Sequence, residues 1–470
     1  MASFDGGAVM VALPSLSDSL CLSYAQTLWV PAVYLLAVAS LLLPAGRAAD
    51  RRGRASFYTA GLGLFCAGSA LAGLTASAWW LFAARCCQGV GGALIVTTSA
   101  ALATETVPPA ERGRALGINT MCVYVGAAAG PPLGGLLVVS LGWRSVFFFS
   151  AIVSGVLLAA LFVQAPSRLP HRHLPLPAPT SRAGPASLLL AVGLAGVLLP
   201  LTFGPLWRWT SWRVSATLAV AVAALALFAL HERYSGTPLV PRELYRGNRL
   251  FTAACTAALL TYTGVYGIPL LAAVHLQVIE GLGADATGAI LLIQPMIMAC
   301  LAPLAGRLYD RVASRGLTTA GALVMAFGAL VLATTGVQGS RATTVLGLAI
   351  IGLGLALFST PNISAVLGSV TPERLSVASA VLGTNRFIGQ ALSVGLLGAI
   401  AAAHLGAAAN GSLTSQIGET SGTTAFASGY RWAMVAGALV ATAAAAVSAT
   451  RGRQEPHGVS GTSGDTLGSG

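Results

Sequence analysis

Two charged residues lie inside apolar stretches that are long enough to cross a bilayer. Asp5 falls in the run from Phe4 to Pro14, and of the fourteen acidic residues it is the one that we place inside a span. Arg85 falls several residues inside another apolar run, 79–102. Ionisable side chains in a membrane are rare, and they mark ion pathways and proton relays. A desolvated carboxylate that faces an arginine can have its pKa set for reversible protonation, so we predict that Asp5 binds a proton, and the cost of a charge in lipid makes Arg85 a functional candidate as well.

A run of small residues and prolines begins at Gly126 and continues, after three alanines, with Gly130, Pro131, Pro132, Leu133, Gly134 and Gly135. Glycines at this spacing let two membrane helices approach backbone to backbone. The prolines favour a kink and leave carbonyl groups that neighbouring helices must satisfy. The run therefore predicts a close helix contact inside a packed bundle.

Several polar or amphipathic side chains in other apolar runs are candidates for lining a binding cavity. They are Tyr124, Tyr262, Tyr266, Gln294, Asn362, Asn385 and Arg386. Each aromatic residue alone is more often a packing residue than a ligand. Together they suit a large, mostly apolar cavity with a few polar groups. Arg386 is the second arginine inside a span. Because a charged side chain in lipid is costly, it is also a functional candidate.

The composition indicates the elements that must position these residues. Of 470 residues, 55% are hydrophobic and 9% are charged, whereas soluble domains carry about a quarter charged residues. The chain is therefore an all-α polytopic membrane protein, with no separate soluble domain. Fourteen apolar runs are separated by Gly, Pro and Arg clusters. We expect spans at 1–17, 25–43, 57–76, 79–102, 114–139, 144–164, 185–204, 213–230, 250–277, 285–305, 316–336, 342–367, 377–404 and 430–450.

The net charge of +12 comes from 26 basic residues, all of them arginine, which concentrate in alternate loops. That distribution sets membrane orientation and places both termini in the cytoplasm. It also argues against nucleic acid as a partner, because no single basic stripe exists. The seven cysteines form no C-x-x-C pair, and we expect no metal site.

A charged glycine-rich segment occurs twice. Gly46, Asp50, Arg51, Gly53 and Arg54 follow the second span, and Asp310 and Arg311 follow the tenth in a similar setting after Gly306. Transporters are commonly built from two repeated halves with the substrate site between them. We predict an N-terminal half at 1–164, linkers and a central helix pair at 165–248, a C-terminal half at 249–450 and a disordered cytoplasmic tail at 451–470.

These motifs resemble those of the major facilitator superfamily, and specifically its fourteen-span drug:proton antiporter family. Gly46-x-x-x-Asp50-Arg51-x-Gly53-Arg54 is similar to the superfamily's loop signature, and Arg85-x-x-Gln88-Gly89-x-Gly91 is similar to its fourth-span motif. The run from Gly126 to Gly135 resembles the fifth-span signature of exporters, and Asp5 precedes a V-A-L-P ending as in the first span of that family.

The resemblance implies a major facilitator fold of two six-helix halves plus a central pair. It also implies roles: proton transfer for Asp5 and Arg85, and a cytoplasmic gate for the Gly46–Arg54 segment with Asp310 and Arg311. The expected function is proton-coupled export of hydrophobic or cationic drugs across the bacterial cytoplasmic membrane. We expect a lipid-embedded monomer that needs no cofactor besides the proton gradient.

Three alternative functions are considered. The chain can be a dedicated exporter of a natural product made by its host, or an importer or facilitator of metabolites, although the run at Gly126–Gly135 argues against import. A membrane-embedded enzyme is disfavoured, because the sequence holds no H-E-x-x-H, G-x-S-x-G or P-loop motif.

Overall fold

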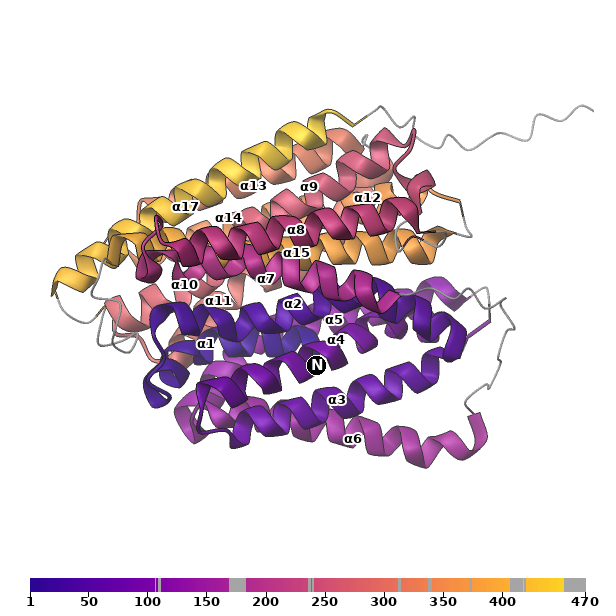
Figure 1. Ribbon diagram of the computed structural model, residues 1–470, viewed down its shortest axis with the longest axis horizontal. Helices are drawn as coiled ribbons and strands as arrows, with labels where there is room; N and C mark the ends of the chain where they lie inside the picture. The colour runs from indigo at the N-terminus through magenta and orange to yellow at the C-terminus, as the bar shows by residue number, and fades with distance from the viewer. Residues whose placement is uncertain are drawn as a thin grey trace, which may run out of the picture.

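The computed structural model describes residues 1–105, 107–108, 111–168, 183–235, 238, 241–311, 314–336, 340–371, 374–405, 417 and 420–451. Within these ranges the regular secondary structure is helical. Most helices run nearly parallel to the long axis of the molecule (Figure 1). This agrees with the all-α membrane architecture that the composition predicts.

Six long helices make up the first part of the chain, and they lie together in the lower part of Figure 1. Their bounds are Ala2–Ser19 for α1, Tyr24–Arg52 for α2, Arg54–Leu74 for α3, Ala78–Glu105 for α4, Arg112–Leu141 for α5 and Arg144–Arg168 for α6. In this part α1 packs on α5, α2 packs on α4, and α3 packs on α4 and α6.

The last part of the chain forms a second group of helices in the upper part of Figure 1. Its elements are α9 (Arg249–Val265), α10 (Ile268–Val274), the π-helical turn η3 (His275–Ile279), α11 (Ala284–Leu291), α12 (Ile293–Arg311), α13 (Ser314–Ala333), α14 (Arg341–Gly368), α15 (Leu375–Leu405) and α17 (Thr420–Ala449). Here α13 packs on α14 and α17, while α9 packs on α15 and α17.

The two groups meet along α2 and α15 and along α5 and α11. The central pair, α7 (Ala183–Trp207) and α8 (Trp212–Tyr234), packs on itself, and α7 also contacts α2 and α15. A short helix, η2 (Arg242–Leu244), follows before α9. The central pair thus lies against the outside of the contact between the two groups.

Thirteen helical segments of the described chain are long and apolar enough to cross a bilayer. They include α9–α10–η3 as one segment and α11–α12 as another. The remaining long helix, α1, has 18 residues, about 27 Å of rise, and lies buried in the bundle. Thirteen of the fourteen predicted spans therefore correspond to helical segments of sufficient length and apolarity, and the span predicted at α1 stays a prediction.

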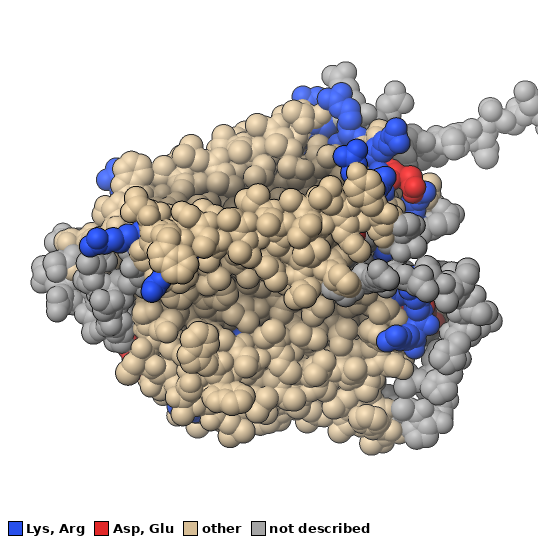
Figure 2. All heavy atoms as spheres, viewed as in Figure 1, with Lys and Arg blue, Asp and Glu red and all other residues tan. Residues whose placement is uncertain are grey.

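The outer surface fits a lipid environment. In Figure 2 the arginine side chains lie mainly at the two ends of the molecule, and a broad belt between them is almost free of charge. Large apolar residues such as Leu157, Val222 and Leu439 are exposed on the long helices. A soluble protein rarely exposes so much contiguous apolar surface, so the belt indicates a multi-pass membrane protein.

Two predicted boundaries differ from the structure. The apolar run predicted at 25–43 belongs to a helix that continues to Arg52, so the charged segment at Gly46–Arg54 is mostly helical and not a loop. The final helix begins at Thr420, ten residues before the predicted start. The predictions follow the most apolar part of each run, and both helices continue past it, α2 through charged residues and α17 through Thr, Ser and Gly residues.

Candidate functional site

The structure brings Asp5 and Arg85 together in the interior of the first helical group. The Asp5 Oδ2 atom lies 2.6 Å from the Arg85 Nη1 atom, and both side chains are at most 1% exposed. Asp5 is placed by α1 and Arg85 by α4, so the ion pair joins two helices that are far apart in sequence. A buried carboxylate beside a guanidinium is suited to holding either a proton or an ion pair.

Neighbouring polar groups complete this pair. Gln88, one helical turn after Arg85, donates from Nε2 to Asp5 Oδ1 at 2.8 Å and accepts from Arg85 Nη1 at 2.6 Å. Arg85 Nε donates to the Val30 carbonyl at 3.1 Å, and its guanidinium lies 4.7 Å from the centre of the Tyr34 ring. The guanidinium is therefore fixed by three helices, α1, α2 and α4.

The glycines of α5 lie directly against α1. A Cβ atom added to Gly130 would lie 2.6 Å from the Phe4 carbonyl oxygen, and one added to Gly134 would lie 2.6 Å from the Ala8 Cα atom. Such distances do not occur for real side chains, so glycine is required at both positions. The close helix contact predicted from this run is confirmed, and it lies on the residues that flank Asp5.

The same segment of α5 also contacts the second helical group. A Cβ atom on Gly135 would overlap the Ala284 carbonyl group at the start of α11, and one on Gly288 would overlap the Pro131 carbonyl oxygen. Gly126 is different, because its nearest neighbour would be at an ordinary 3.6 Å. The α5 glycines therefore join α1 to α11 across the two groups.

Part of the predicted cavity set converges between the groups. Tyr124 of α5 interacts with Thr360, Tyr262 and Arg386 of the second group. The Tyr262 hydroxyl lies 3.3 Å from that of Ser359, and the Arg386 guanidinium lies 6.0 Å from the Tyr262 ring centre. In the described chain the Arg386 Nε atom is buried without a hydrogen-bond partner.

Tyr266 connects this cluster to the Asp5–Arg85 pair, because it interacts electrostatically with Arg85, Asp5 and Arg386. Its hydroxyl would lie 3.6 Å from a Cβ atom added to Gly6, the residue after Asp5. Tyr266 is the cap residue of α9, at the break before α10. An aromatic group from the second half therefore reaches the buried pair of the first.

The structure does not add the remaining polar residues to this cluster. Asn362 is buried in the second group, where its amide donates to the Ala254 carbonyl and accepts from Arg451. Asn385 interacts with Tyr245 and Cys255. Gln294 is 9% exposed, and its backbone lies against Gly352 on α14.

The predicted disordered tail does not begin at Arg451, because this residue is buried. The sequence places it in a disordered segment, but it is 1% exposed and its Nη1 atom lies 3.4 Å from the Thr318 hydroxyl. The charge is held by neutral groups, with Asn362 as the main acceptor. Residues 452–470 lie outside the described residues.

The predicted gate segment forms an ion-pair cluster at one end of the first group. Arg54 lies 2.7 Å from Asp50 and 2.5 Å from Glu105 at the end of α4. The half-buried Arg47 guanidinium donates to the Pro238 carbonyl before η2. Gly53 has φ +104°, a conformation that other residues rarely adopt, and it allows α2 to end and α3 to begin within one residue.

The remaining gate residues are less fully placed. A Cβ atom added to Gly46 would meet only the Thr97 side chain, at an ordinary 3.8 Å. Arg51 lies in the last turn of α2. Asp310 and Arg311 fall within α12, but their side chains lie outside the described residues.

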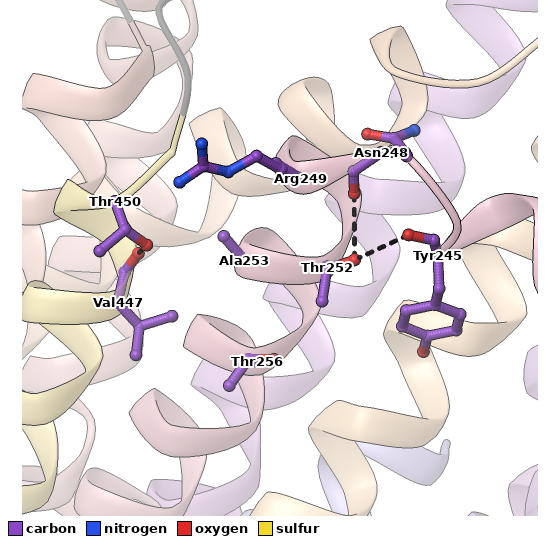
Figure 3. A pocket seen from close by; sticks show the side chains of 9 residues that line it. Tyr245, Asn248, Arg249, Thr252, Ala253, Thr256, Val447 and Thr450 are labelled. Atoms are coloured by element: carbon purple, nitrogen blue, oxygen red, sulfur yellow. Dashed lines mark hydrogen bonds between the residues drawn. The ribbon is translucent and has the colours of Figure 1, made fainter.

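A cavity of about 330 Å³ opens near this end between α9 and α17 (Figure 3). Its lining includes Tyr245, Asn248, Arg249, Thr252, Thr256 and Thr450. Asn248 caps α9 through the Phe251 backbone amide, so the cavity lies at a helix start. None of the predicted cavity residues lines it, and it is separate from the Tyr262 cluster.

Comparison with known proteins places this arrangement in a family. The profile of the Major Facilitator Superfamily matches residues 1–394. The chain belongs to this superfamily. It is similar to the multidrug resistance protein Stp of Mycobacterium tuberculosis, with 32% identity over 410 residues that cover 87% of this chain and 74% of that protein. It is also similar to the methylenomycin A resistance protein of Streptomyces coelicolor, with 31% identity over 85% of this chain and 83% of the relative.

Solved structures support the same fold. A POT family transporter in complex with 5-aminolevulinic acid superposes with a TM-score of 0.67 at 15% identity and covers 95% of this chain and 92% of its own. A bacterial homologue of the lysosomal transporter Spinster, in an inward-facing and unoccupied conformation, gives a TM-score of 0.64 at 20% identity, covering 95% and 93%. As a major facilitator, the protein is expected to carry its substrate site between the two helical groups.

Proposed function

We propose that the protein is a proton-coupled antiporter that exports drugs or antibiotics across a bacterial cytoplasmic membrane. The relatives support the drug or antibiotic part, because they include a multidrug resistance protein and an antibiotic resistance protein. The observation that carries the proton part is the buried Asp5–Arg85 pair, which lies against the α5 glycine contact. Among the ion pairs of the described residues, it is the one in which both side chains are at most 1% exposed.

Protonation of Asp5 would neutralise the carboxylate and remove the attraction that holds Arg85 at 2.6 Å. Because Asp5 lies on α1 and Arg85 on α4, the change would loosen the link between these helices. The α1 residues beside Asp5 also contact Gly130 of α5. Because Gly135 of the same helix lies against Ala284 of α11, a shift of α5 would carry the effect of the proton to the contact between the two halves, which is what coupling in an alternating-access carrier requires.

The cluster of Tyr124, Tyr262 and Arg386 is the proposed substrate region. Aromatic rings supply large apolar contact area, and a tyrosine ring attracts a cation over its face. The Arg386 guanidinium opposes a cation but suits an anionic or carbonyl-bearing group. The region fits an amphipathic aromatic compound with a polar group that accepts hydrogen bonds.

The second candidate is a dedicated exporter of one natural product. It is favoured by a relative of Streptomyces glaucescens, the tetracenomycin C resistance and export protein, with 29% identity over 86% of this chain and 74% of the relative. The two candidates differ in breadth and share the coupling proposed for Asp5. Transport of several unrelated dyes supports the multidrug function, and transport of one compound class supports the dedicated exporter.

The test is drug-driven proton movement in inverted membrane vesicles with an acidic lumen, using ethidium and a panel of polyketide antibiotics. Asp5→Asn keeps the shape of the side chain and removes the titratable oxygen, so we expect it to abolish proton release while drug binding survives. Asp285→Asn, an exposed acid on α11, is the matched control. Wild-type proton release in Asp5→Asn would refute the role of Asp5, and drug accumulation without proton movement would refute antiport.

A further inference from the structure

A second buried ionisable pair lies in the C-terminal helical group, away from Asp5 and Arg85. His275 is fully buried at the start of η3, and its Nε2 atom lies 3.6 Å from the Glu280 Oε1 atom. Both ring nitrogens of His275 and the Glu280 Oε1 atom are buried without a hydrogen-bond partner in the described chain. Three such atoms close to one another are costly, because each has lost water without gaining a partner.

The surroundings hold this pair in place. The Glu280 Oε2 atom lies 3.4 Å from the Arg341 Nε atom at the start of α14, and Arg341 is 62% exposed. The His275 ring stacks on Tyr430 of α17, with ring centres 4.9 Å apart. Asp285 on α11 and Arg431 on α17, the other charged groups on the elements that pack here, are exposed. Glu280 thus has one exposed cation beside it, and His275 has one aromatic ring against it.

An added proton would strengthen this arrangement. Neutral His275 with its proton on Nε2 can donate to ionised Glu280, and a proton on each ring nitrogen would make that hydrogen bond charge-assisted. A proton on Glu280 would allow the carboxyl group to donate to the imidazole instead. Either protonated state favours closure of the 3.6 Å gap between Nε2 and Oε1. Burial also raises the pKa of the Glu280 carboxyl, in spite of Arg341.

The pair is linked to the contact between the two halves. His275 and Gln277 share the five-residue π-helical turn, and Gln277 Nε2 donates to the Val11 carbonyl of α1 at 2.9 Å. Single π-turns within helices are rare and occur frequently at functional sites. A displacement of His275 would therefore move Gln277, which binds α1, the helix that carries Asp5.

We propose that His275 and Glu280 form a second proton-binding site, and that its occupancy sets the strength of the Gln277–Val11 contact between the two halves. The pair lies at the end of the bundle opposite the Arg54 cluster. The arginine distribution predicts that the end that carries the pair is extracellular. There it can take up a proton from the outer medium. This inference rests on the proposed antiport only for its use in transport, since proton binding can be measured without a drug.

The first test is a drug-free NMR titration of the full chain in lipid nanodiscs, labelled with ¹⁵N-histidine and ¹³C-glutamate. Loss of a signal in His275→Gln or Glu280→Gln assigns it. We expect a titration between about pH 4 and 8 at one of the two groups, and a midpoint shift of about one to three pH units when the partner is replaced. The matched control is His404→Gln, an exposed histidine of α15, which should leave both midpoints unchanged.

The second test measures the distance between spin labels at Ser140→Cys on α5 and Asp285→Cys on α11, in a background without the native cysteines. We expect the distance distribution to change between pH 5 and pH 8 in Asp5→Asn, which removes any contribution of Asp5, and to become independent of pH when Glu280→Gln is added to that variant. Titration midpoints that do not shift when the partner residue is replaced would overturn the proton site. Coupled midpoints with a distance that never responds to pH would overturn the link to α1. Neither result depends on whether Asp5 couples transport.

Discussion

Replacement of Gly135 by alanine should weaken the contact between α5 and α11. The added Cβ atom would overlap the Ala284 carbonyl group and lie 2.9 Å from the Asp285 Cα atom. These are backbone atoms, which cannot turn away as a flexible side chain does, so the two helices must separate. Gly117 lies on the same helix, and a Cβ atom added there would have no heavy atom within 4 Å, which makes Gly117→Ala the matched control.

The magnitude follows from two opposing effects. Forcing extra atoms into a packed contact costs about 1–3 kcal/mol. Alanine is better than glycine inside a helix by about 1 kcal/mol, but α5 is helical whether the contact is made or broken, so this gain cancels. The ratio of contacted to separated molecules should therefore fall by about 5-fold to 150-fold in Gly135→Ala, and it should not change in Gly117→Ala.

The assay is the spin-label distance between Ser140→Cys on α5 and Asp285→Cys on α11, both exposed positions on either side of the contact. Gly135→Ala should move population to longer distances, with the thermal unfolding midpoint recorded in parallel to separate opening from unfolding. A distribution in Gly135→Ala that matches Gly117→Ala at unchanged stability would refute the argument. It would mean that α11 adjusts locally and that the glycine is not required for the contact.

Three further predictions concern stability in detergent, measured by thermal unfolding. Gly53→Ala should lose about 1–2 kcal/mol, because φ is +104° there, whereas Gly46→Ala should lose nothing comparable. Asn362→Leu should lose about 1–3 kcal/mol by leaving the buried Arg451 charge without its acceptor, and Arg451→Met in the same chain should restore most of it. The raised pKa of Glu280 favours its protonated form in the folded state, so its stabilising contribution should be present at acid pH and be lost as the pH rises through that raised pKa. Glu280→Gln should remove this part of the pH dependence, and an unchanged profile would contradict it.

The pairing of Asp5 with Arg85 could be predicted from the sequence because the cost of charge in lipid leaves few alternatives. Its setting could not be predicted in full. Gln88 is accessible to sequence reasoning, since it lies three residues after Arg85 on one helix face. The Val30 carbonyl and the Tyr34 ring come from α2, and nothing in the local sequence indicates which face of one helix meets another.

The end of the bundle near Arg451 shows the opposite failure. The sequence analysis predicts that Arg451 begins a disordered tail, because it follows the last apolar run and precedes a polar segment rich in Gly, Ser and Thr. Burial of Arg451 depends on Thr318 and Asn362, which precede it by 133 and 89 residues. Sequence reasoning misses the pair of His275 and Glu280 for a related reason. Five residues separate them, a spacing that brings side chains together only because the turn between them is π-helical.

The three contacts of α1 explain how one short helix can relate proton occupancy to the arrangement of the two halves. Asp5 binds Arg85 on α4, Ala8 lies under Gly134 of α5, and the Val11 carbonyl accepts from Gln277 of η3. All three residues of α1 are fully buried, and they lie within two helical turns. A rigid helix transmits a displacement of one of these residues to the other two, because the helices at the glycine contacts are too close together to absorb it. If protons bind as proposed above, binding at either end of this set would change the same interface, so a separate relay between the two sites is unnecessary.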